Sequence, residues 1–283
     1  MFTSCYSVKH FSSEILYPAE NVFDKEITDV TLINRSYLPI EKRKQAGIFY
    51  KEGTYFRETE YNDSIVSDNA LYSLAYRLNE SLRFNIVRND TITKLNNDKD
   101  VFLQPLLYDE VKDICDNHGA QAAVSLETFY SFDSLFVVYE GGYRLIRMTR
   151  LLSVYKFYFP HDGRLSTIDS KYYDDTLYWS VSGGLFDDLY DDMISRKDAL
   201  YEVSYNSGIK FAERISPHWQ SVNRLYYENS DEKMKLAAQY AELKEWKEAA
   251  KIWKEVTVSD KKISSALAKY NMAVASEMIG ELD

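Results

Sequence analysis

The chain has 283 residues, of which 45% are hydrophobic and 28% are charged, so its composition excludes a disordered protein and allows one large core or two smaller ones. The formal net charge of −10 argues against a general nucleic-acid binder, because phosphate contacts require clustered Lys and Arg. Two cysteines without CxxC spacing exclude a multi-bridge disulfide framework, and no stretch approaches the roughly 20 apolar residues of a membrane-spanning helix.

The first five residues, Met1 to Cys5, resemble the end of a bacterial lipoprotein signal peptide. Small residues before a cysteine suit the signal peptidase, and the cysteine thiol then takes the lipid, so Cys5 is the lipidation candidate. The alternative is a frayed N-terminus with an exposed thiol. Tyr6 to Ser13 is polar and shows no helix or strand period, so residues 1–18 are predicted to be a tether or leader remnant.

Strands and helices are predicted to alternate in the next part of the chain, with β-branched runs as strands and apolar residues at helical spacing as helices. This order implies an α/β layer. The predicted elements are a strand at 26–36, a long loop with a short hairpin at 37–63, a helix from Ser67 or Asp68 to Leu82, a strand at 84–88, a helix from Tyr108 to a stop at Gly119 and a strand at 120–132.

Two long aromatic runs, 145–159 and 165–178, are predicted to form a hairpin through Pro160–Gly163, because Asp-Gly is a strong hairpin signal. The 24 tyrosines suit the partly exposed faces of such a sheet, with a binding surface as the alternative. The remaining predicted elements are a turn at 181–184, an acidic helix at 185–193, a helix from Ser195 to Ile215 and a strand or linker at 220–227. Residues 19–228 are thus predicted to form an α+β or α/β domain, a mixed sheet with flanking helices and a long β-hairpin.

The composition changes at Asn229, after which Gly and Pro are absent until Gly280, so 229–283 is predicted to be a separate helical segment. Its small and large residues alternate as two closely packed antiparallel helices require. The predicted packing residues are Leu236, Ala237, Tyr240, Trp246, Ala249, Trp253, Met272 and Ala275.

This segment resembles the tetratricopeptide repeat family in five of those residues: Leu236, Ala237, Tyr240, Ala249 and Trp253 fall at the repeat's signature places. Met272 follows Leu236 by 36 positions, against a usual period of about 34. Lys233 departs from the pattern where an aromatic residue is usual, and Ser259 or Asp260 stands where Pro is common. The resemblance implies one helical hairpin, Asp231 to Val256, and the first helix of a second unit that is incomplete at Asp283. The alternative is a plain three-helix tail packed on the sheet domain.

The whole chain resembles a family of uncharacterised Bacteroidota-type envelope lipoproteins, which join an α/β domain of unknown function to tetratricopeptide units. The residues that carry this resemblance are Phe2–Cys5, Val30–Arg35, Ile215–Trp219, Arg224 and Tyr226–Tyr227. The resemblance implies a lipidated Cys5 and brings no known activity and no catalytic residues.

Catalytic, cofactor-binding and metal-binding patterns are missing from the sequence. The four histidines are scattered, and no GxSxG, GxGxxG or phosphate-binding glycine loop is present. Cys115 follows an apolar residue on a predicted helix, which favours a buried and inert thiol. Asp188 and Asp192 share a helix face and are able to hold a divalent cation, although a solvated acidic face is the favoured interpretation.

The predicted function is a non-enzymatic protein-interaction or scaffold protein without a cofactor, anchored by lipid in a bacterial cell envelope such as the outer membrane. The helical repeat is predicted to bind a protein or peptide, with no nucleic-acid partner and with membrane contact by the lipid anchor only. One alternative is a small-ligand-binding or enzymatic sheet domain with its site at the strand ends near Asn34 and Arg35. The other is a cytosolic scaffold, if Met1 is the true start.

Overall fold

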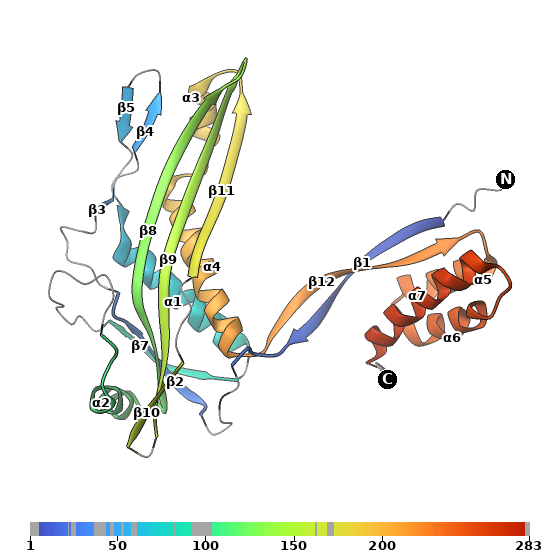
Figure 1. Cartoon of the computed structure of the whole chain (residues 1–283), viewed down its shortest axis with the longest axis horizontal. Coiled ribbons are helices and arrows are strands. Elements are labelled where there is room, and N and C mark those ends of the chain that lie inside the picture. Colours follow the sequence, from blue (N-terminus) through green and yellow to red (C-terminus); the bar gives the residue numbers. More distant parts are fainter. Residues whose placement is uncertain are drawn as a thin grey trace. The chain divides into compact units, whose positions relative to one another are not determined.

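The two ends of the chain fold together, and its middle forms a unit of its own (Figure 1). The computed structural model divides into Pro18–His218, here the sheet unit, and a helical unit that joins Met1–Tyr17 to Trp219–Asp283. The chain is a mixed α+β protein with a helical C-terminal segment, which confirms the predicted fold class. The structure describes residues 6–21, 23, 27–36, 44–45, 48–51, 54–57, 61–81, 83–91, 104–161, 163–168 and 173–280.

Parallel strands form the centre of the sheet unit. β2 (Asp29–Asn34) lies between β7 (Asn85–Thr91) and β8 (Ala122–Tyr139) and pairs with both in parallel. α1 (Asp63–Glu80) lies between β2 and β7 along the chain, and α2 (Tyr108–His118) lies between β7 and β8. This order confirms the predicted alternation of strands and helices. Parallel neighbouring strands require crossover connections, and α1 and α2 lie in those connections.

Antiparallel strands extend the sheet beyond β8. β9 (Tyr143–His161) pairs with β8, and β10 (Arg164–Ile168) and β11 (Tyr173–Gly183) pair with successive parts of β9. The run predicted at 165–178 therefore forms two strands along a single partner. The hairpin predicted between the two aromatic runs is confirmed, and Gly163 in its turn has a left-handed φ of 73°.

The turn predicted at Val181–Gly184 begins too early. β11 continues through Gly183, where Val181 pairs with Leu145 and Gly183 pairs with Tyr143. β9 begins at Tyr143, so β11 has a hydrogen-bonding partner as far as Gly183. This pairing overrides the turn preference of Gly183 and Gly184.

Between β2 and α1, the described residues form four short strands. β4 (Ile48–Lys51) and β5 (Thr54–Arg57) form an antiparallel hairpin, and β4 also pairs with β8. β3 (Lys44–Gln45) and β6 (Tyr61–Asn62) form a separate two-stranded sheet. The short hairpin predicted in this long connection is confirmed, while residues 37–43, 46–47, 52–53 and 58–60 of the predicted loop lie outside the described residues.

Helices cover both faces of the sheet at its centre. α1 and α4 (Arg196–Ile215) pack on one face, around a core that includes Leu32 and Tyr155. α2 packs on the other face against Tyr158. α3 (Phe186–Asp192) covers the far end of the β8–β9 hairpin, on the same side as α4 (Figure 1).

The helix boundaries follow local hydrogen bonds. Ser195 caps α4 as predicted, because its side chain accepts from the backbone N–H of Asp198 at 3.1 Å. Gly119 ends α2 as predicted, with a left-handed φ of 67°. The cap predicted at Ser67 or Asp68 is wrong, since α1 begins at Asp63 and Ser67 instead accepts a hydrogen bond from Asn34 Nδ2 at 2.9 Å.

A two-stranded ribbon begins the helical unit. β1 (Tyr6–Tyr17) pairs with β12 (His218–Asn229), and the two strands run in opposite directions (Figure 1). The prediction that residues 1–18 form a tether is therefore wrong for Tyr6–Tyr17. Alternate residues of β1, such as Phe11, are only half-buried, and the other residues are exposed. The sequence of β1 therefore lacks the strong apolar alternation that indicates a strand. Because β12 also belongs to this unit, the predicted boundary at 228/229 moves to 218/219.

Three helices complete the helical unit. α5 (Glu232–Glu242), α6 (Trp246–Thr257) and α7 (Lys262–Ile279) confirm the predicted hairpin and the helix that follows it. The side-chain amide of Asn271 on α7 joins the helices to the ribbon, since its Oδ1 accepts from Tyr227 N at 2.8 Å and its Nδ2 donates to Tyr227 O at 2.7 Å. This pair of bonds satisfies backbone groups that a neighbouring strand would otherwise satisfy.

Candidate functional site

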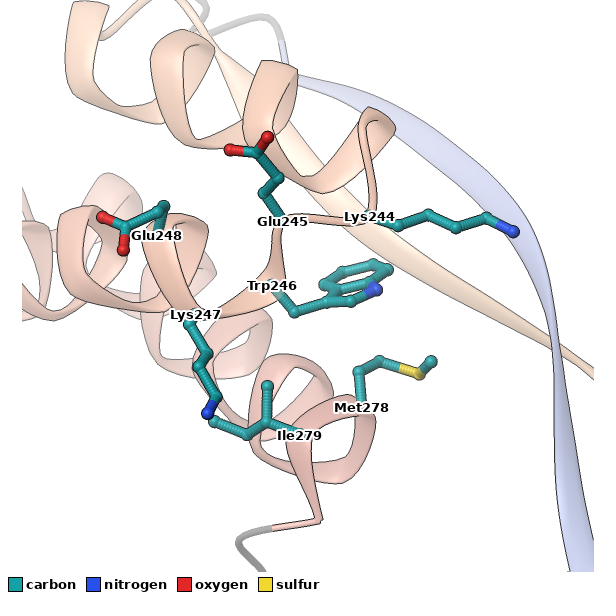
Figure 2. A pocket seen from close by; sticks show the side chains of 7 residues that line it. All are labelled: Lys244, Glu245, Trp246, Lys247, Glu248, Met278 and Ile279. Atoms are coloured by element: carbon teal, nitrogen blue, oxygen red, sulfur yellow. The ribbon is translucent and has the colours of Figure 1, made fainter.

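An open pocket of about 490 Å³ lies on the helical unit, between the start of α6 and the end of α7 (Figure 2). Its floor is apolar and consists of Trp246, Met278 and Ile279. Its rim is charged and carries lysines and glutamates from one short stretch of the chain: Lys244, Glu245, Lys247 and Glu248.

A tight connection between α5 and α6 positions this site. Lys244 adopts a left-handed φ of 62°, which stops α5 and turns the chain, and the backbone N–H of Glu245 closes the turn on Tyr240 O at 2.9 Å. α6 therefore begins at once with Trp246.

The ribbon holds Trp246 in place. The ring of Phe11 on β1 lies 4.7 Å from the ring of Trp246, and Tyr226 on β12 meets it edge-on at 6.1 Å. Because only 8% of Trp246 is exposed, its ring is fixed by the core and offers an edge to the pocket. A ring that is already ordered loses little entropy when it binds a partner.

The chemistry of the pocket suits binding. Its side chains are apolar groups, ammonium groups and carboxylates, without a paired nucleophile and base. Within the residues that the structure describes, no cluster of three or more His, Cys, Asp and Glu is arranged to hold a metal ion. An apolar side chain flanked by charges would match the chemistry of this pocket.

Most of the predicted packing residues lie in the core of the helical unit. Ala237, Trp246, Ala249, Trp253 and Ala275 are buried there, and Tyr240 and Met272 are partly buried against them. Of these, Trp246 also lines the pocket.

Leu236 is the exception among the predicted packing residues. Its side chain is 46% exposed, so its predicted packing role is wrong. The buried stripe of α5 runs through Met234, Ala237, Ala238 and Ala241 at helical spacing, which turns Leu236 to the outer side.

Trp246 is the one pocket residue that the sequence analysis names, and the apolar floor residues Met278 and Ile279 are among those that it misses. The signal that was available for them is their place at the end of α7, immediately before Gly280, where apolar side chains lie beside a helix end.

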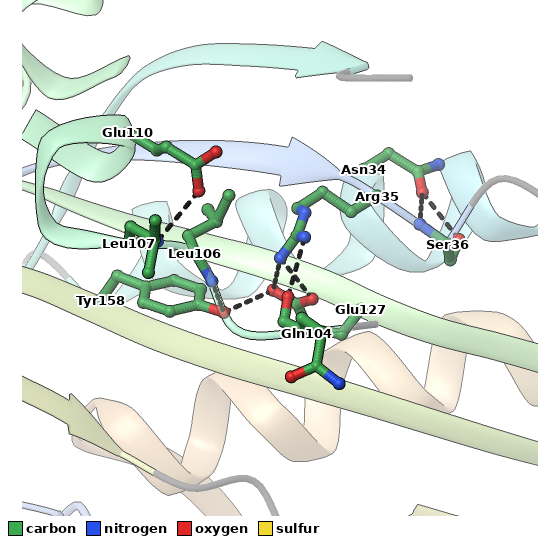
Figure 3. Close-up of polar contacts among 9 residues, drawn as sticks. All are labelled: Asn34, Arg35, Ser36, Gln104, Leu106, Leu107, Glu110, Glu127 and Tyr158. Atoms are coloured by element: carbon green, nitrogen blue, oxygen red, sulfur yellow. Dashed lines mark hydrogen bonds and ion pairs between the residues drawn. The ribbon is translucent and has the colours of Figure 1, made fainter. Parts of the chain in front are cut away.

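The predicted alternative site near Asn34 and Arg35 is a cluster of buried groups that bind one another (Figure 3). Arg35 Nη1 donates to both carboxylate oxygens of Glu127, at 2.8 and 2.6 Å, and Nη2 donates to Gln104 O at 3.1 Å. Tyr158 donates its hydroxyl to Glu127 Oε1 at 2.8 Å. Burial, with the Glu127 charge, raises the pKa of Tyr158, so this hydroxyl remains a donor.

These contacts favour a structural role for the Arg35 cluster. Arg35 is 6% exposed and Glu127 is 4% exposed, and among the buried side-chain N and O atoms described in this cluster only Nε of Arg35 lacks a hydrogen-bond partner. Asn34 is engaged as well, because its Nδ2 donates to Ser67 and to Asp68 Oδ1 at 2.9 and 2.8 Å. The polar atoms that a ligand would need are thus bonded within the fold.

A second buried ionic cluster joins β8, β9 and the start of α4. Asp133 accepts from Arg147 Nη1 and from Thr149 Oγ1, both at 2.9 Å, and lies 3.4 Å from Arg196 Nε. Arg147 Nε also donates to Ile194 O at 3.0 Å. The sequence did not indicate this cluster, because the charges come from three elements that meet only in the fold.

The remaining candidates from the sequence have structural surroundings. Cys115 is buried, and this burial raises the pKa of its thiol to about 11, so the thiol stays protonated and unreactive at neutral pH. His118 Nδ1 lies 2.7 Å from Thr31 Oγ1. Cys5, the lipidation candidate, lies outside the described residues.

Comparison with known families places both parts of the chain. The model described as "Domain of unknown function (DUF8603)" matches residues 27–227. The chain belongs to the DUF8603 family. The DUF8603 domain spans the sheet unit from β2 onward and most of β12, and a second model, "Domain of unknown function (DUF6340)", matches residues 235–283. The predicted relation to an uncharacterised family is confirmed at this level.

No curated protein matches this DUF8603 chain. Across the parts of the chain that the structure describes, every helix is too short or too polar to cross a membrane.

Proposed function

We propose that this chain is a non-enzymatic protein-interaction or scaffold protein whose helical unit binds a protein or peptide partner. The observation that carries the proposal is the apolar pocket floor, in which Met278 and Ile279 are partly buried and Trp246 is a buried ring with one edge at the pocket. Trp is among the residues that contribute most binding energy at protein interfaces.

The size and rim of the pocket favour a peptide segment as the partner. A volume of about 490 Å³ accommodates more than one side chain of a peptide segment. The rim alternates in charge along Lys244, Glu245, Lys247 and Glu248, so a bound segment with flanking charges of either sign finds a counter-charge.

The helical unit acts, in this proposal, as a tetratricopeptide-type element. Support comes from the helical hairpin of α5 and α6, the third helix α7, and the burial of Ala237, Ala249 and Trp253 at the seam between helices. Such elements present side chains at helix ends and grooves to peptides or to neighbouring units.

A peptide selection on the purified full chain tests the binding proposal. We expect a phage-displayed random peptide library to yield sequences with a central apolar residue, and Ile279→Glu to abolish their binding because it places a charge in the pocket floor. Ile263→Glu, an exposed position near the other end of α7, serves as the matched control and should leave binding intact. Peptides that bind Ile279→Glu as well as the wild type, or no enrichment at all, would contradict the proposal.

The proposal also includes a lipid anchor on Cys5 in a bacterial cell envelope, supported by the small residues that precede this cysteine. β1 begins at Tyr6, the next residue. A lipid on Cys5 would therefore be attached one residue before the ribbon.

Metabolic labelling tests the anchor. The gene with its natural upstream sequence is expressed in bacteria fed an alkyne analogue of palmitate. Label should enter the wild type and the Cys115→Ser control and should be absent from Cys5→Ser. Label that persists in Cys5→Ser, or an unlabelled wild type, would reject the anchor without affecting the peptide result.

A further inference from the structure

The strands β8, β9 and β11 have one covered face and one open face. On the covered face, Leu135 and Leu145 pack against Phe186 and Leu189 of α3. On the other face, aromatic side chains are in contact with solvent: Tyr130 is 41% exposed, Phe132 46%, Phe136 47% and Tyr178 66%. Hydrophobic groups of this size on one sheet face are uncommon in a monomeric protein.

The strand register defines the open face. Residues directly opposite each other in antiparallel strands share a face, and so do alternate residues along each strand. The open face consists of Tyr130, Phe132, Ser134, Phe136 and Val138 of β8; Arg144, Ile146, Met148, Arg150 and Leu152 of β9; and Asp174, Thr176, Tyr178, Ser180 and Ser182 of β11.

Each of these residues is exposed or half-buried. The same face of β9 continues to Tyr158, where α2 covers it. α2 thus covers one end of the face and leaves the β8–β9–β11 end open.

Apolar residues predominate on β8 and on the part of β9 between Arg144 and Arg150, while β11 carries polar residues on either side of Tyr178. Arg150 reaches across to Asp174, whose Oδ1 accepts from Arg150 Nε at 2.6 Å, and this pairing lowers the pKa of Asp174. The open face therefore has an apolar stripe on β8 and a largely polar border on β11, the pattern of an interface core and its rim.

We propose that the open face packs against the open face of a second copy of this chain. The apolar residues of β8 on the open face are able to pack against the same residues of a second copy. A two-fold axis that crosses the strands at Ser134 and Met148 places Phe132 against Phe136 of the second copy, and Tyr130 against its Val138. Two such sheets pack about 10 Å apart with side chains interdigitated.

The size of the open face fits a weak dimer. A standard interface buries about 800 Å² per partner with about 20 to 30 residues, so three strands with five residues each bury about 500 Å² per copy. The total of about 1,000 Å² lies at the low end for a specific interface, where weak and transient associations are found.

Sedimentation velocity over a concentration series tests the dimer. We expect the wild type to change from monomer to dimer as concentration rises. Phe132→Lys should remain a monomer, because it places two ammonium groups near the axis. Tyr72→Lys, at a 62% exposed position on α1, is the matched control and should dimerise as the wild type does.

A milder pair of variants covers the case in which Phe132→Lys does not fold. In a Cys5→Ser background, a short bismaleimide should cross-link Ser134→Cys, at the axis, and should leave Ser182→Cys, at the edge, uncross-linked. A wild type that is monomeric at every concentration, or equal cross-linking at both positions, would overturn the proposal.

Discussion

Single side chains decide the stability of the sheet unit, and Glu127 is the clearest case. Glu127→Gln removes the charge that faces Arg35 in a site where both residues are buried, so an uncompensated guanidinium remains. We expect a loss of about 3 to 5 kcal/mol of unfolding free energy, measured by urea denaturation. Glu140→Gln, at an exposed position, is the control and should change little. A loss near zero in Glu127→Gln would show that the Arg35 cluster is not a structural element.

Glu277 gives the helical unit a pH dependence. Arg224 donates to both of its carboxylate oxygens, and this pairing lowers the pKa of Glu277 below its ordinary value. Stability from a lowered carboxyl pKa is fully present above the unfolded pKa of about 4.3 and is lost as pH falls through the folded pKa.

Glu277→Gln removes the carboxylate and with it the stability that the lowered pKa provides at neutral pH. Both partners are about one-third exposed, so the variant should be less stable than the wild type by about 1 kcal/mol or less at pH 7. The difference should vanish in strong acid, where the wild-type carboxyl is protonated too. Thermal unfolding of the helical unit at both pH values measures this, and a difference that persists in acid would contradict it.

Residues that the sequence could identify are those whose environment is local. Cys115 was predicted to be buried from its neighbour on the helix, and Ser195 was predicted to be a cap from its place before a helical run. The Arg35–Glu127 pair was not predicted, because its partners are 92 positions apart and each alone resembles a surface charge.

Helix packing in the sheet unit depends on Gly208. A Cβ there would lie 2.1 Å from Ala70 O and 2.1 Å from Ser73 Oγ on α1, and a backbone oxygen of α1 cannot move aside alone. Gly208→Ala should therefore separate α4 from α1 and cost about 3 kcal/mol or more. Gly184→Ala is the control, since a Cβ there meets no atom within 4 Å. Equal melting temperatures for the two variants would contradict this packing.

The N-terminal strand is predicted to stabilise the helical unit. Phe11→Ala removes the ring that packs on Trp246, so hydrogen exchange of the α6 amides should become faster, with a loss of about 1 to 3 kcal/mol for a half-buried aromatic ring. Leu16→Ala, at a 51% exposed position on the same strand, should leave α6 unchanged. Unchanged exchange in Phe11→Ala would restore the tether interpretation.

Elements with strong periodicity were predicted well, and β1 and the pocket were missed for a common reason. The helices from α2 to α7 and the parallel strands carry clear patterns or caps in the sequence. β1 was missed because its burial depends on β12, more than 200 positions along the chain, and on α6. The pocket was missed for the same reason, since α6 and α7 form it jointly.

At the scale of the whole molecule, both ends of the chain belong to the helical unit. A domain boundary at 228/229 would therefore separate β12 from α5, α6 and α7. The family matches divide close to the same place, with DUF8603 ending at 227 and DUF6340 beginning at 235. The ribbon therefore belongs with the helices structurally, although most of β12 falls within the DUF8603 match.

Site-specific photocrosslinking in the native cell tests the proposed binding role most directly. A photoreactive amino acid at Met278 lies in the pocket floor, and the same amino acid at Ile263 lies near the other end of α7. The proposal predicts a discrete crosslinked protein from position 278 that is absent from position 263 and that is lost when Trp246→Ala is added. Crosslinks of equal pattern from both positions, or none from position 278, would contradict a binding function for this pocket.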